Sequence, residues 1–217
     1  MDGAPAPMTA TRRLILAGGL GLAAGGAWTA NAAPVGAVPA SEPDDMILGN
    51  PKARVTVIEY ASVGCPHCAH WANETFAPFK ARFIDSGKVR FVLRECITGD
   101  APVAVAGFLL ARRAGPAKYF QVVEGMFAGF EPMHAPGGTP DAVMRPLAKS
   151  VGLTDADYEA AVMDPDAFTA LRERSERHFE VDKVDSTPTF FLNGQKLDGA
   201  PDLAAFTTAI NAALKKR

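Results

Sequence analysis

Residues 54–71 read RVTVIEYASVGCPHCAHW, and they carry two cysteines directly after a run of β-branched and aromatic residues. Val, Ile and Tyr favour extended backbone, so a strand is predicted over residues 54–61. A short turn then leads to Cys65 and Cys68, which stand at the start of the next element. The C-x-x-C pair is therefore expected between the end of a strand and the beginning of a helix.

That helix is predicted over residues 66–84, because its aromatic residues recur at roughly helical spacing. They are Trp71, Phe76, Phe79 and Phe83. Pro66 suits the first helical position, where its missing N–H would have no partner in any case. Pro78 lies inside the helix and is expected to kink it.

The rest of the chain predicts a second strand, a block of helices, a hairpin and a final helix. The second strand covers residues 88–95, and the turn Asn193-Gly194 predicts a hairpin between strands at 189–192 and 196–197. Turn signals divide the block into segments 101–114, 117–129, 140–150, 155–163 and 165–180, and the last helix covers 202–214. The fold class is therefore α/β over residues 46–217, with a helical subdomain inserted at about 100–181.

The N-terminal region has the pattern of an export signal. Arg12-Arg13 precedes an apolar run over residues 14–28, and Ala30-Asn31-Ala32 offers a cleavage site. Residues 1–33 are thus predicted to be a signal peptide of twin-arginine type, followed by a flexible lead-in at 34–45. An uncleaved anchor or a chance Ala-rich tail is the alternative. Export implies a periplasmic location, where conditions are oxidising.

Composition narrows the function classes further. The chain has 217 residues, a net charge of −2 and 21% charged residues. This charge gives no basic field for nucleic acid, so none is expected as a partner. Three cysteines are too few for a small fold stabilised by disulfide bonds, and a chain long enough for a core of this size does not need them.

The C-x-x-C position gives the two cysteines different chemistry. Unpaired N–H groups at a helix start, and the helix dipole, stabilise a thiolate at Cys65. His67 adds positive charge nearby, and such surroundings lower a cysteine pKa to about 3.5–7.5. Cys65 is therefore expected to be the attacking sulfur, with Cys68 one helical turn away to form or resolve a disulfide.

These motifs resemble those of DsbA-like thiol:disulfide interchange proteins of the thioredoxin superfamily. Residues 57–62 leading into Cys65-Pro66-His67-Cys68, residues 91–95 and residues 186–191 carry the resemblance. It implies a thioredoxin-like fold interrupted by a helical domain. It also implies a monomeric dithiol oxidase without a cofactor, which donates disulfides to unfolded or partly folded exported proteins and is re-oxidised by a quinone-linked membrane partner of the DsbB type.

The resemblance assigns three further residues. Thr187-Pro188 matches a cis-proline loop that faces the cysteine pair and binds an extended substrate segment. Glu59 matches a buried acid beneath the pair that relays protons to or from Cys68. The alternatives are an ordinary trans proline and a strand glutamate that faces solvent. Cys96 departs from the family, which more often has an apolar residue there, and we expect a buried small side chain rather than a regulatory thiol or a dimer bridge.

Other functions remain open at this point. A reductase or disulfide isomerase would use the same chemistry, although residues 34–47 are too short and Pro-rich for the dimerisation region of such isomerases. A non-catalytic binding or chaperone module could keep the fold. A zinc site would need four ligands, and only His67, His70 and Cys96 stand beside the pair, so no metal is expected. A purely structural disulfide would close a very small loop and stabilise little.

Overall fold

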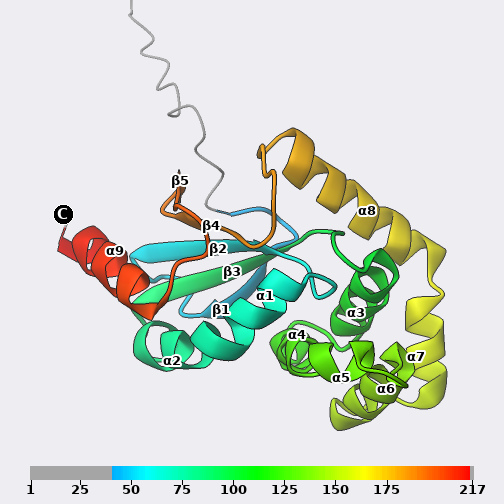
Figure 1. Cartoon of the computed structure of the whole chain (residues 1–217). Helices are drawn as coiled ribbons and strands as arrows, with labels where there is room; N and C mark the ends of the chain where they lie inside the picture. The colour runs from blue at the N-terminus through cyan, green and yellow to red at the C-terminus, as the bar shows by residue number, and fades with distance from the viewer. Residues whose placement is uncertain (1–40, 216–217) are drawn as a thin grey trace, which may run out of the picture. The chain divides into compact units, whose positions relative to one another are not determined.

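The computed structural model describes residues 41–215, which contain a five-stranded sheet with strand order β1-β3-β2-β4-β5 (Figure 1). The strands are β1 Met46–Gly49, β2 Val55–Ala61, β3 Val89–Glu95, β4 Thr189–Leu192 and β5 Gln195–Lys196. β2 and β3 run parallel, and the other neighbouring pairs are antiparallel. The predicted signal at 1–33 and residues 34–40 of the predicted lead-in lie outside the described residues.

One long helical stretch follows β2 and begins with Pro66-His67-Cys68, the last three residues of the C-x-x-C motif. It consists of α1 Pro66–Trp71, a π-helical turn Ala72–Phe76, α2 Ala77–Phe79 and a second π-helical turn Lys80–Ile84. The predicted span of 66–84 is therefore confirmed. The predicted disturbance around Pro78 takes the form of π-helical winding on both sides of α2, which is a common way for helices to accommodate a change of path.

The predicted helical insertion lies between β3 and β4. Its helices are α3 Ala101–Arg113, α4 Tyr119–Ala128, α5 Phe130–His134, α6 Pro140–Ser150, α7 Asp155–Val162 and α8 Pro165–Glu180, and α9 Leu203–Lys215 ends the described chain. Figure 1 shows α3–α7 gathered at the end of the sheet that lies away from α9. Among residues 41–215, no helix is both long and apolar enough to cross a bilayer.

Two elements, β1 and α5, were not predicted from the sequence. β1 has four residues directly after an acidic, proline-containing segment, and α5 has five residues after Gly129. Both are shorter than the window in which hydrophobic periodicity can be recognised. β1 is held by its pairing with β3, so it depends on a contact that local sequence does not contain.

The two faces of the sheet bury two separate apolar cores. Val57 and Ala61 of β2 face the larger core, which includes α1, α2, α4 and α9. Ile58 and Tyr60 face a smaller core, whose members include Cys96. Cys96 is fully buried, which confirms the expected burial of its side chain.

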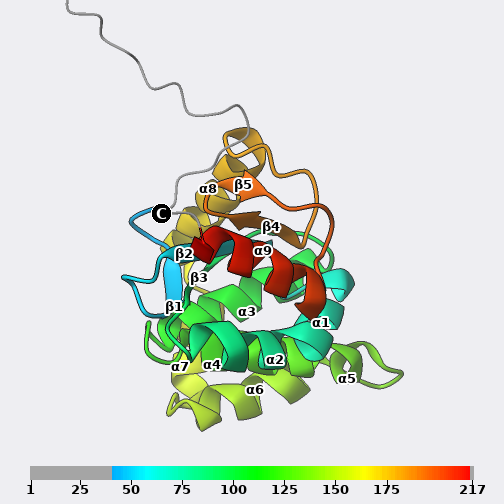
Figure 2. The ribbon, with the colours of Figure 1, turned by 90° about the vertical axis from the view of Figure 1, so that its left-hand side faces the viewer.

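Trp71 fixes the start of the long helix against α9. Its indole Nε1 donates a hydrogen bond to the carbonyl oxygen of Pro201 at 2.9 Å, and its ring packs on Phe190 and Phe206. Figure 2 shows α9 nearest the viewer, alongside α1 and α2. The C-x-x-C end of α1 is thus held against both the sheet and the last helix.

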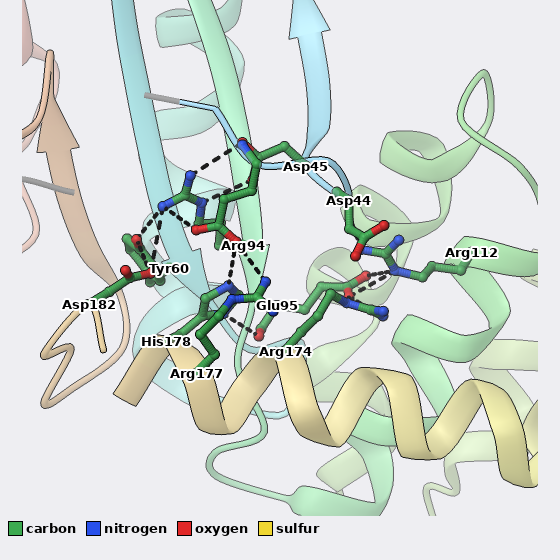
Figure 3. A network of polar contacts seen from close by, with 11 residues as sticks. Asp44, Asp45, Tyr60, Arg94, Glu95, Arg112, Arg174, Arg177, His178 and Asp182 are labelled. Atoms are coloured by element: carbon green, nitrogen blue, oxygen red, sulfur yellow. Dashed lines mark hydrogen bonds and ion pairs between the residues drawn. The ribbon is translucent and has the colours of Figure 1, made fainter. Parts of the chain in front are cut away.

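Buried charges tie the first described residues to the sheet (Figure 3). Arg94 of β3 is almost completely buried, and its guanidinium lies 3.0 Å from Asp45, 3.1 Å from Glu42 and 2.6 Å from the Tyr60 hydroxyl. Its Nη1 also lies 3.6 Å from Asp182. The described part of the predicted lead-in, residues 41–45, is therefore held against the sheet through Glu42 and Asp45.

The next residue, Glu95, forms a second buried cluster toward the inserted helices. Its carboxylate accepts hydrogen bonds from Arg112 of α3 at 2.7 Å, from Arg174 of α8 at 3.0 Å and from the Tyr119 hydroxyl of α4 at 2.9 Å. Two arginines on one buried carboxylate satisfy its acceptor positions. Through Glu95, β3 anchors the helical subdomain beside the loop that follows it.

Candidate active site

Cys65 is the N-cap residue of α1, with extended backbone (φ −102°, ψ 123°), and Pro66 is the first helical residue. The Cys68 thiol donates a hydrogen bond to the Cys65 sulfur, and this is the main reason that the pKa of Cys65 is lowered to about 5. The Thr187 hydroxyl and the backbone N–H groups of Cys68 and His67 also lower this pKa, whereas burial opposes them. The structure thus stabilises the thiolate form of Cys65.

Cys68 has the opposite character. Its side chain is fully buried, and burial is the main reason that the pKa of its thiol is raised. Its hydrogen bond to Cys65 and the charges of Glu59 and Cys65 raise this pKa further. The backbone N–H of Ser62 points at its sulfur from 3.5 Å. The two sulfurs of the motif therefore differ: Cys65 is the better nucleophile and leaving group, and Cys68 is a protonated thiol.

The loop before β4 lies against Cys65. The Thr187–Pro188 peptide bond is cis, as the sequence motif predicts. The Cys65 sulfur lies 3.4 Å from the Thr187 carbonyl oxygen, so residues that are 122 positions apart meet at the reacting atom. Thr187 thus presents both its hydroxyl and its backbone at the place where a substrate sulfur must approach.

A third loop, which follows β3, completes the site and was not predicted from the sequence. The Thr98 hydroxyl oxygen lies 2.7 Å from that of Thr187. The backbone N–H of Asp100 donates to the carbonyl oxygen of Gly64 at 2.8 Å. A Cβ atom added to Gly64 would lie 2.2 Å from the Asp100 carbonyl oxygen, so only glycine fits this approach. The sequence Gly99-Asp100-Ala101-Pro102 carries an N-cap signal that could have located this loop.

Glu59 lies on β2 and faces the same side of the sheet as α1. The side chain is 2% exposed. Burial, with a smaller contribution from Cys65, raises the pKa of this carboxyl to about 8. Glu59 in turn contributes to the raised pKa of Cys68. The alternative of a solvent-facing strand glutamate is therefore wrong, while a role for Glu59 in proton transfer stays a prediction.

Pro66 and His67 are the exposed members of the predicted site. Pro66 begins α1, and His67 supplies a backbone N–H to the Cys65 sulfur. The structure thus gathers Cys65, Cys68 and Thr187 at one place, with Pro188 adjoining Thr187 and Glu59 buried behind Cys68.

A family model described as thioredoxin matches residues 41–212. The chain belongs to the thioredoxin family. The predicted fold, a thioredoxin-like sheet with a helical insertion, is thereby confirmed. The solved structure of Wolbachia pipientis alpha-DsbA1 superposes on this thioredoxin-family protein with a TM-score of 0.73 at 22% identity, and the match covers 81% of this chain and 94% of that one. BdbD from Bacillus subtilis matches with a TM-score of 0.66 at 22% identity over 79% of this chain and 93% of that one.

Several sequence relatives of this thioredoxin-family protein have names that refer to disulfide chemistry. A Rickettsia conorii protein provisionally named a protein-disulfide oxidoreductase is 26% identical over 80% of this chain. The chain spans 62% of the length of that relative. The Bacillus subtilis protein named disulfide bond formation protein D is 23% identical, and the match covers 78% of this chain and 77% of that protein.

The described part of this thioredoxin-family protein brings one group of metal-ligating side chains within reach of each other, at Glu42, His178 and Asp182. The guanidinium of Arg94 lies 3.1 Å from Glu42 and 3.6 Å from Asp182. Fixed cations therefore already pair with these carboxylates, because Arg177 also lies 2.6 Å from Glu42. Burial lowers the pKa of His178, whose Nδ1 lies 3.1 Å from the Glu95 carbonyl oxygen.

Proposed function

We propose that this thioredoxin-family protein is a thiol:disulfide oxidoreductase that donates the Cys65–Cys68 disulfide to exported proteins. The asymmetry of the cysteine pair is the observation that carries the proposal. The pKa of Cys65 is lowered to about 5, and burial raises that of Cys68. A stabilised Cys65 thiolate stabilises the reduced protein, and a protein whose reduced form is stabilised has a strongly oxidising disulfide.

The reaction follows from this asymmetry. A substrate thiolate attacks the Cys65 sulfur of the disulfide, and Cys68 leaves and takes up a proton. A second substrate thiolate then attacks the substrate sulfur of this mixed disulfide, and Cys65 leaves as its stabilised thiolate. The substrate loses two electrons and gains a disulfide, while the Cys65–Cys68 disulfide is reduced to a Cys65 thiolate and a Cys68 thiol. Re-oxidation needs a disulfide or quinone-linked oxidant, for which a membrane partner of the DsbB type is suited.

The substrate in this proposal is an unfolded or partly folded protein with reduced cysteines. The carbonyl oxygen of Thr187 lies 3.4 Å from the Cys65 sulfur, so an extended segment paired with the Thr187 backbone would present its own sulfur to Cys65. The name of the Bacillus subtilis relative, which refers to disulfide bond formation, supports this direction. A periplasmic location is part of the same proposal and rests on the signal pattern of residues 1–33.

Three cysteine variants test the proposal in an assay of disulfide transfer to a reduced, unfolded protein. Cys65→Ser should abolish transfer, and Cys68→Ser should accumulate mixed disulfides that a reductant releases. Cys96→Ala is the matched control, because Cys96 is fully buried in the other core and should leave the rate unchanged. Transfer by Cys65→Ser at the wild-type rate would rule the function out.

The equilibrium of the pair with glutathione separates an oxidase from a reductase of the same fold. An oxidase should have a potential near that of DsbA, about −120 mV, rather than that of thioredoxin, about −270 mV. A value near the thioredoxin figure would favour the reductase. No exchange with glutathione at all would favour a non-catalytic binding module.

A further inference from the structure

Glu59 has an acceptor atom without a partner. Among residues 41–215, its Oε1 is the buried side-chain oxygen that forms no hydrogen bond. A buried polar atom without a partner costs free energy, so it is kept where it serves a purpose or binds water. β2 holds Glu59 between Leu93 of β3 and Phe190 of β4, and neither of these side chains can donate a hydrogen bond.

A small cavity, which we call the inner cavity, adjoins this carboxyl. The volume that the centre of a water molecule can occupy in this cavity is about 10 Å³, which is close to the minimum that one buried water needs. Apolar side chains form most of its wall, including Trp71, Phe76, Phe91 and Phe127. Glu59 stands at one side of the wall, and Glu124 of α4 is the other carboxyl that lines it.

Glu124 also belongs to the surface. It lines an open depression of about 450 Å³ between the long helix and α4, which we call the outer groove. Ala72, Phe76 and Phe127 line both the inner cavity and the outer groove. Glu124 is thus a carboxyl that adjoins the buried space next to Glu59 on one side and solvent on the other.

We propose that Glu124 is the outer group of a proton path that runs from solvent through one water in the inner cavity to Glu59 and Cys68. The proposal rests on the proposed disulfide exchange and assigns a positioning residue for its proton. When Cys68 leaves as a thiolate, the Glu59 carboxylic acid donates a proton to its sulfur. The Glu59 carboxylate then takes a proton from the water, which Glu124 resupplies from solvent. Re-oxidation moves the same proton outward.

The charged surroundings of both carboxyls agree with this role. Glu59 interacts electrostatically with the sulfurs of Cys65 and Cys68 at the start of α1, and its charge also raises the pKa of Cys96, which follows β3. Partial burial raises the pKa of Glu124, so that it can carry a proton nearer neutral pH than a free glutamate.

Lys80 and Asp85 are the charged groups that act on Glu124 from the end of the long helix, and their charges oppose each other. They are paired to each other at 2.9 Å. Within residues 41–215, Glu124 forms no hydrogen bond or ion pair, so no structural contact accounts for the carboxyl at this position.

The test follows the rate at which the Cys65–Cys68 disulfide is reduced by a small dithiol at several pH values. Glu124→Gln removes the titrating group from an exposed position and should slow the reduction by about tenfold, less than the 10²–10⁴ of a group that transfers the proton directly. Glu173→Gln on α8 is the matched control, because Glu173 is exposed and far from the inner cavity in the sequence and the fold. Thermal unfolding of both variants checks that each is folded.

Chemical rescue separates a proton-transfer role from a structural one. Glu124→Ala should be as slow as Glu124→Gln, and added formate should restore part of its rate while leaving that of Glu124→Gln unchanged. Equal rates for Glu124→Gln, Glu173→Gln and wild type would overturn the proton path while the proposed function stands. A wild-type disulfide that does not exchange with thiols at any pH would overturn both.

Discussion

The hydroxyl oxygens of Thr98 and Thr187 lie 2.7 Å apart, and this hydrogen bond joins the two loops that flank the Cys65 sulfur. If Thr98 donates, the Thr187 hydroxyl proton is free to reach the sulfur, and that hydroxyl is one of the groups that lower the pKa of Cys65. The Cys65 thiolate is thus stabilised by the Thr187 side chain as well as by the first turn of α1. The strand-then-helix pattern around Cys65 indicated only the contribution of the first helical turn.

Thr187→Val should therefore raise the pKa of Cys65. A hydrogen bond to a charged group contributes about 1.5–3 kcal/mol, so the pKa is expected to rise by about 1 to 2. Thiolate ultraviolet absorbance, followed against pH in the reduced protein, measures it. Thr187→Ser keeps the hydroxyl and should restore the low value, and Thr208→Val on α9 is a control at an exposed position. A titration of Thr187→Val that overlies the wild type would show that the hydroxyl does not contact the thiolate.

Gly64→Ala should disturb the site from the backbone. Its Cβ would lie 2.2 Å from the Asp100 carbonyl oxygen, and an overpacked position typically costs about 1–3 kcal/mol. Because Gly64 precedes Cys65 directly, the displaced loop should also weaken the N–H contacts to the sulfur and raise the pKa of Cys65.

Gly115→Ala provides the comparison for this variant. Gly115 has a φ of +80° and no atom near its added Cβ, so the substitution brings left-handed strain of about 1–2 kcal/mol without a clash. Its Cys65 titration should match the wild type. Similar unfolding curves for wild type and Gly64→Ala would mean that the loop can move aside at no cost.

Sequence patterns predicted the parts of the molecule that are determined by neighbours along the chain. The strand over 55–61, the helix from Pro66 and the hairpin at Asn193-Gly194 follow from local propensity, periodicity and turn chemistry. The Thr98–Thr187 contact joins residues that are 89 positions apart, so no local pattern contains it. The same holds for the cavity between Glu59 and Glu124, which exists only because α4 of the insertion packs beside the long helix.

Arg94→Met should destabilise the protein far more than the loss of an exposed arginine. The Arg94 side chain is 1% exposed and lies against Glu42, Asp45 and Asp182, so its removal takes the ion-pair partner from the buried carboxylates of Asp45 and Asp182, whereas Glu42 keeps Arg177. Breaking a buried ion pair by removing one partner costs about 3–5 kcal/mol.

Arg172→Met is the matched control for this change, since the Arg172–Glu176 pair on α8 is exposed and contributes about 0.3–0.5 kcal/mol. Denaturant unfolding at low and high salt measures both variants. High salt should reduce the small loss of unfolding free energy caused by Arg172→Met. The large loss caused by Arg94→Met should stay the same. Equal midpoints for the two variants would contradict the proposed role of Arg94 in holding residues 42–45.

Glu59→Gln should make the reduced protein more stable than the wild type, by an amount that grows with pH. Burial raises the pKa of Glu59 in the folded state to about 8, whereas a glutamate in the unfolded chain titrates near 4.5. The folded state therefore holds a proton that the unfolded state has lost between these values, and stability falls as pH rises through this window. Glutamine does not titrate, so the difference in unfolding free energy between Glu59→Gln and wild type should grow by up to about 1.4 kcal/mol per pH unit between pH 4.5 and 8 and level off above pH 8.

Thermal unfolding of the reduced proteins across this pH range measures the difference, with Glu173→Gln as the control that should follow the wild type. Parallel curves for Glu59→Gln and wild type would mean that Glu59 is already ionised in the folded protein at pH 5, and the buried acid would then have no proton to give to Cys68.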